Sequence, residues 1–138
     1  MKNFNWNFVL AIVAALATMF VVVMIMEFIS HDLYPPTEDM EHAEKDAIRE
    51  FLAGAPFKAL VLMPLGWVLG AFAGAFVGAN IHQAKRRAIF FIVAIFTLMA
   101  GLMMMIQYPS PWYFWAISAF IFPAALLGSR LIAKNKEV

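Results

Sequence analysis

Four long hydrophobic runs constrain this chain more than any other feature, because each is long enough to cross a lipid bilayer as a helix. They extend over about residues 8–29, 59–81, 88–106 and 112–133. The hydrocarbon core of a bilayer is about 30 Å thick and needs roughly 20 apolar residues in an α-helix. Helices satisfy their backbone hydrogen bonds internally, which lipid requires. The sequence therefore predicts an all-α polytopic membrane protein, a four-transmembrane-helix bundle that forms one domain over residues 1–138.

The composition agrees with a chain that is dissolved in lipid. Hydrophobic residues make up 64% of the sequence and charged residues 14%, against roughly 45–50% and about 25% in soluble domains. The chain has no cysteine, which excludes disulfides, thiolate metal sites and cysteine nucleophiles. Its net charge of +1 gives no reason to expect a nucleic-acid partner, and no cofactor motif is recognised.

The distribution of lysine and arginine predicts the orientation of the bundle. Seven of the ten basic residues lie at the N-terminus, in the second connection and at the C-terminus: Lys2, Lys85, Arg86, Arg87, Arg130, Lys134 and Lys136. Such residues concentrate in cytoplasmic segments. The first connection, residues 30–56, has seven acidic and only two basic residues. We therefore expect both termini on the cytoplasmic side and the first and third connections outside.

The first outer connection is predicted to contain a short amphipathic helix over about residues 38–52. Pro35 and Pro36 enforce an extended stretch, after which Thr37 can serve as an N-cap. Apolar residues then recur at steps of three and four on one side: Met40, Ala43, Ala47, Ile48 and Phe51. Gly54 and Pro56 end the pattern. This helix either caps the outer face of the bundle or offers a docking surface to a partner.

The most specific pattern in the sequence is a series of glycines in the second span. Gly66, Gly70, Gly74 and Gly78 follow one another at intervals of four residues, which places them on one helix face. In lipid, helix association depends on close packing, and small residues allow two backbones to approach. The series predicts a helix-packing groove. The groove can receive another span of the same chain, the same helix of a second copy, or a lipid or cofactor tail.

Few residues suggest chemistry. Glu27 lies near the outer end of the first span, and Lys58, at a similar depth, is its expected partner in an interfacial ion pair. Glu27 and His31 are four residues apart and are weak metal candidates, but two ligands do not define a metal site. No catalytic spacing is recognised around the serines or histidines.

Several features together resemble a known kind of membrane protein. They are Tyr34-Pro35-Pro36 after the first span, Gly70-Ala71-x-x-Gly74-Ala75 in the second, and Pro109-x-Pro111-Trp112 before a fourth span with Pro123 and Gly128. Over most of its length the chain resembles small uncharacterised four-span inner-membrane proteins of bacteria. The resemblance implies this topology and assigns no activity to any residue.

Three hypotheses for function remain at this point. The first is a non-catalytic accessory, scaffold or self-associating membrane subunit, because packing signals are abundant and chemical signals scarce. Its partners would be membrane lipids and either copies of itself or a larger membrane complex. The second is a small oligomeric transporter or channel. The third is a membrane protein that binds lipid or metal, or a membrane enzyme, with Glu27 and His31 as its centre.

Overall fold

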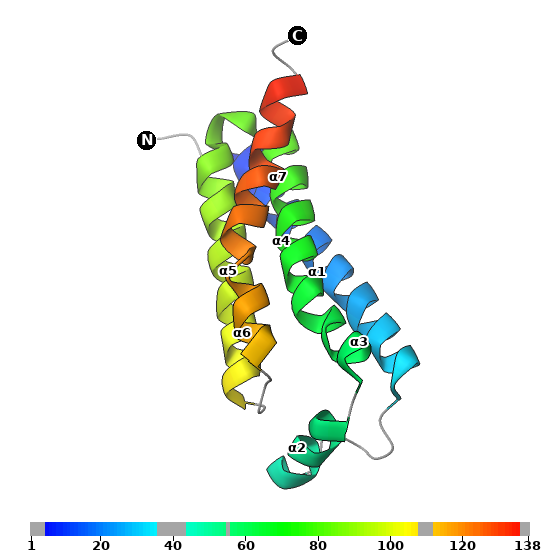
Figure 1. Ribbon diagram of the computed structural model, residues 1–138. Coiled ribbons are helices and arrows are strands. Elements are labelled where there is room, and N and C mark those ends of the chain that lie inside the picture. The colour runs from blue at the N-terminus through cyan, green and yellow to red at the C-terminus, as the bar shows by residue number, and fades with distance from the viewer. Residues whose placement is uncertain (1–4, 36–43, 55, 108–111, 136–138) are drawn as a thin grey trace.

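The computed structural model describes residues 5–35, 44–54, 56–107 and 112–135, and all the described secondary-structure elements are helices (Figure 1). Its elements are α1 (Trp6–Leu33), α2 (Lys45–Gly54), α3 (Phe57–Leu60), α4 (Leu62–Ile81), the short 3-10 helix η1 (Gln83–Lys85), α5 (Arg86–Gln107), α6 (Trp112–Ser118) and α7 (Ile121–Asn135). Four helical stretches are long and apolar enough to cross a membrane: Trp6–Leu33, Phe57–Ile81, Gln83–Gln107 and Trp112–Leu131. The predicted all-α class with four spans and a short additional helix is confirmed.

Two of the spans are interrupted, and a proline explains each interruption. The second span divides at Val61 into α3 and α4, three residues before Pro64. The fourth divides between Ser118 and Ile121 into α6 and α7, just before Pro123. Proline has no backbone N–H, and its ring clashes with the carbonyl four residues earlier. Helical hydrogen bonds are therefore lost at these two levels of the bundle.

Local sequence sets both ends of α1. Asn5 is its N-cap, and the Oδ1 atom of Asn5 accepts a hydrogen bond from the backbone N–H of Phe8 at 3.2 Å. At the other end the backbone N–H of Tyr34 donates to the carbonyl oxygen of Ser30 at 3.0 Å, and Pro35 then favours an extended conformation for Tyr34. At 28 residues α1 is about 42 Å long, which exceeds the thickness of the hydrocarbon core.

Helix α4 lies at the centre of the bundle, with α1 along one side and α5 and α7 along the other (Figure 1). Its buried residues are mostly small: Gly66, Gly70, Ala71, Gly74, Ala75, Gly78 and Ala79, together with Pro64 and Trp67. The facing helices contribute buried residues that include Ala11, Ala15, Ile89, Val93, Ala94, Ile121 and Ala125. The core is thus built from backbones that approach closely, with larger side chains filling the space between α4, α5 and α7.

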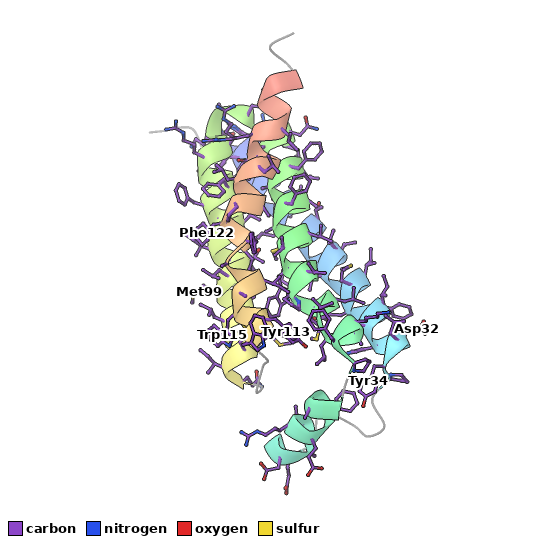
Figure 2. All side chains as sticks on the ribbon, in the orientation of Figure 1. Asp32, Tyr34, Met99, Tyr113, Trp115 and Phe122 are labelled. Atoms are coloured by element: carbon purple, nitrogen blue, oxygen red, sulfur yellow. The ribbon has the colours of Figure 1, made fainter. Side chains whose placement is uncertain are left out.

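Helix α2 lies beyond the ends of the spans and is joined to the bundle through Tyr34 (Figures 1 and 2). The rings of Tyr34 and Phe51 are 4.8 Å apart between centroids. Ile48 is buried, while Asp46, Arg49 and Glu50 are exposed, so the described helix is amphipathic in the sense predicted. The predicted start of this helix at residues 37 and 38, with Met40 and Ala43, lies outside the described residues.

Candidate functional site

The four glycines of α4 line the contact with α1. A Cβ atom at Gly66 would lie 2.9 Å from Met26 Cβ, and one at Gly70 would lie 3.0 Å from the carbonyl oxygen of Met19. At Gly74 the nearest atom would be the carbonyl oxygen of Ala15 at 2.6 Å. These distances are shorter than van der Waals contact, so no larger side chain fits while α1 keeps its position.

The first span of the same chain therefore occupies the glycine face of α4. At Gly78 a Cβ atom would meet Ile89 Cγ2 at 2.7 Å and Ala15 Cβ at 2.9 Å. Along the series the neighbours on α1 run from Met26 back to Ala11, so the two helices are antiparallel and stay in contact over about four turns. The sequence left three possible occupants of the groove open, namely another span, a second copy or a lipid or cofactor tail. In the structure the occupant is another span of the same chain.

A second close approach joins α4 to α7 through Gly128. A Cβ atom at Gly128 would fall against the backbone of Phe72, including its carbonyl oxygen. The sequence interpretation gave Gly128 no role in packing. The fourth span does contain a sequence pattern that could have predicted this contact. It has two pairs of small residues spaced four apart, Ala124 with Gly128 and Ala125 with Ser129, and this is the spacing of the glycine face.

Buried hydroxyl groups find acceptors within or between the helices. Ser30 Oγ donates to the carbonyl oxygen of Ala59 at 2.6 Å and so ties α1 to α3. Thr97 Oγ1, on α5, lies 2.7 Å from the carbonyl oxygen of Val93 and 2.7 Å from the sulfur of Met19 on α1. Ser118 Oγ donates to the carbonyl oxygen of Phe114 at 2.6 Å. An unsatisfied hydroxyl in an apolar interior is costly, and each of these three has an acceptor.

Aromatic side chains fill the space between the second and fourth spans near the end that carries α2. The rings of Phe57 and Tyr113 are 4.8 Å apart, and those of Trp67 and Phe114 are 6.0 Å apart, both edge-to-face. Tyr113 lies on the side of α6 that faces the second span, whereas Trp115 is exposed (Figure 2). An exposed tryptophan at a span end is typical of the membrane interface.

The ionisable candidates on α1 do not converge on a site. Glu27 is half-buried, whereas His31 and Lys58 are exposed, and within the described residues no ion pair joins Glu27 to Lys58. Across residues 5–35, 44–54, 56–107 and 112–135, no group of three or more histidine, aspartate or glutamate side chains is placed to hold a metal ion. Glu27 and His31 share one face of α1 by their spacing, and no third ligand joins them in this part of the chain.

Comparison with protein-family models, with curated proteins and with solved structures gives no match for this chain. The resemblance to bacterial four-span proteins therefore has no identified relative behind it. What the helices themselves support is a small multi-pass integral membrane protein.

Proposed function

We propose that this small integral membrane protein is a non-catalytic subunit of a membrane assembly, an accessory or scaffold protein that associates with copies of itself or with a larger complex. One observation carries the proposal, namely the use of polar groups inside the bundle. Ser30, Thr97 and Ser118 all direct their hydroxyls to acceptors within or between helices. The described interior is organised for packing, which is the requirement of a structural subunit.

Self-association would not involve the glycine face, because α1 of the same chain already covers it. The exposed parts of the spans remain for contacts with other chains. These parts include Val13 and Met24 on α1, Met99 on α5 and Leu127 on α7. Apolar side chains are equally well solvated by lipid tails, so association at such faces depends on shape and packing.

Cysteine cross-linking in native membranes tests the proposal directly, since the chain has no cysteine of its own. We expect Val13→Cys, Met24→Cys, Met99→Cys or Leu127→Cys to give one discrete cross-linked species, to a second copy or to a partner that mass spectrometry identifies. Ala15→Cys, buried against α4, is the matched control and should give none. A lone monomer, found both by cross-linking at all four positions and by native mass spectrometry, would contradict the subunit hypothesis.

Glu27 is the observation that favours the alternative, a small oligomeric transporter or channel. Its carboxyl group is half-buried in an apolar helix, and ionisable residues within spans often mark ion pathways. Vesicles that contain the purified protein separate the two hypotheses. Flux of a small ion that Glu27→Gln abolishes would replace the subunit hypothesis with transport, whereas equal and negligible flux for both proteins supports a subunit.

The proposal includes a bacterial inner membrane with both termini in the cytoplasm. The support for this orientation is the segregation of charge: the basic turn between α4 and α5 lies at the same end of the bundle as the start of α1 and the end of α7, and α2 lies at the other end (Figure 1). Basic residues are retained on the cytoplasmic side.

The orientation can be tested with two exposed alanines, Ala53 on α2 and Ala84 in the turn, whose replacement changes no charge. In intact cells we expect a membrane-impermeant maleimide to label Ala53→Cys and to leave Ala84→Cys unlabelled until the membrane is opened. Labelling of both from the same side would overturn the four-span topology, and the reverse pattern would overturn the orientation alone.

A further inference from the structure

The turn between α4 and α5 is tied to the start of α1 by a defined hydrogen-bond pair. The Oδ1 atom of Asn5 accepts from the N–H of Phe8, so its Nδ2 atom faces His82 and donates to His82 Nε2 at 3.0 Å. An amide nitrogen can only donate. The His82 ring also packs edge-to-face on the Phe8 ring, with 5.9 Å between the two ring centroids.

Three consecutive cations follow this anchor. Lys85 Nζ lies 4.6 Å from the centroid of the Phe8 ring, a cation–π contact that fixes the ammonium group at the first turn of α1. Arg86 is half-buried and Arg87 is exposed, and both begin α5, whose N-terminal end adds partial positive charge.

Nothing acidic in the described part of the chain balances these cations. The acidic residues that the structure describes are on the second half of α1, just before α2 or within α2: Glu27, Asp32, Glu44, Asp46 and Glu50. Helix α2 and the end of α1 lie at the opposite end of the bundle from the basic turn (Figure 1). The charge at the turn must therefore be balanced by groups other than these carboxylates.

The same turn has a buried donor that lacks an acceptor. Gln83 Nε2 is shielded from solvent and has no hydrogen-bond partner among the described residues. Buried polar groups in proteins nearly always have a partner. Because this nitrogen is shielded by the protein, the cations of the turn, and not this amide, are the groups that an anion outside the protein can reach.

We propose that the α4–α5 turn binds the phosphate group of an anionic phospholipid in the leaflet at this end of the bundle. Lys85, Arg86 and Arg87 supply the charge that attracts the phosphate. Arginine binds phosphate through paired N–H groups, and lysine acts as a point charge. A lipid phosphate is favoured over a soluble one because Lys85 is held on Phe8, in the first turn of a membrane-spanning helix. This inference does not depend on the proposed subunit role.

Lipid retention by the full-length protein tests the inference. The protein in non-ionic detergent is given equal amounts of phosphatidylglycerol and phosphatidylcholine, and native mass spectrometry measures the retained lipid. Wild type should retain phosphatidylglycerol in at least tenfold preference. A basic residue near a membrane surface contributes about 1 kcal/mol, so Lys85→Gln and Arg86→Gln should each lower that preference about fivefold. Lys58→Gln, which removes an exposed cation at the opposite end, should leave it unchanged.

Phe8→Leu provides a test that changes no charge. Loss of the ring that holds Lys85 should lower the preference about threefold, while the helix content in phosphatidylcholine stays at the wild-type value. Equal retention of the two lipids by wild type would overturn the inference, as would an unchanged preference in both Lys85→Gln and Arg86→Gln. Displacement of phosphatidylglycerol by 10-fold excess inorganic phosphate would also overturn it, because the site would then belong to a soluble anion.

Discussion

Replacement of Gly74 by leucine should lower the free energy of unfolding by about 3 kcal/mol. The new Cβ atom would lie 2.6 Å from the carbonyl oxygen of Ala15 and 3.2 Å from Met19 Cβ. A backbone oxygen cannot rotate away as a side chain can, so α1 would have to move outward as a whole. That movement would loosen the neighbouring contacts at Gly70 and Gly78, since interhelical contact in lipid depends on close packing.

Unfolding of the purified protein in mixed micelles, with increasing mole fraction of sodium dodecyl sulfate, measures this effect. Ala17→Leu is the matched control, because Ala17 lies on the exposed side of α1 and also gains a leucine side chain. Leu98→Ala on the half-buried side of α5 should be milder than Gly74→Leu. Equal stability of Gly74→Leu and Ala17→Leu would show that the glycine face is incidental to the fold.

Replacement of Gly128 by leucine should have an effect of similar size, about 3 kcal/mol, on the other side of α4. Its Cβ atom would fall against the carbonyl oxygen of Phe72 and lie 3.1 Å from the carbonyl carbon of the same residue. Relief requires α7 to separate from α4. We therefore expect the fourth span to detach first, while the contact between α1 and α4 is retained.

Limited proteolysis in micelles, read together with the unfolding curve, distinguishes this outcome from general loss of structure. Cleavage should appear first in α6 or α7 of Gly128→Leu and not in α1. Ala116→Leu, at an exposed position of α6, serves as the control and should behave as wild type. Wild-type stability and cleavage of Gly128→Leu would mean that α4 and α7 do not pack through this residue.

Much of the architecture could be predicted because the solvent is lipid. Each span has to be about 20 apolar residues long and helical. The number of spans and the all-α fold class therefore follow from hydropathy alone. Pro64 and Pro123 explain the two helix interruptions once the structure is known, since the loss of a backbone donor is a local effect. The polar and apolar sides of α2 follow from helical spacing, with Ile48 buried and Glu50 exposed.

The neighbours of a given side chain were much less predictable. Glu27 and Lys58 have a similar expected depth, yet no ion pair joins them in the described chain, because depth does not specify how two helices are rotated about their axes. His82 and Asn5 are 77 residues apart in the sequence, and their side chains are joined by a hydrogen bond. The local sequence around either residue does not indicate this contact.

The sequence by itself determined that the chain has four helical spans and that α4 carries a face of small residues. Only the tertiary structure decided that α1 occupies that face, that Gly128 meets Phe72, and that a basic turn is anchored on Asn5 and Phe8. The reason is physical. Span length and proline chemistry act within one helix, whereas the choice of neighbour depends on the rotation and relative depth of helices whose apolar surfaces lipid solvates almost equally well.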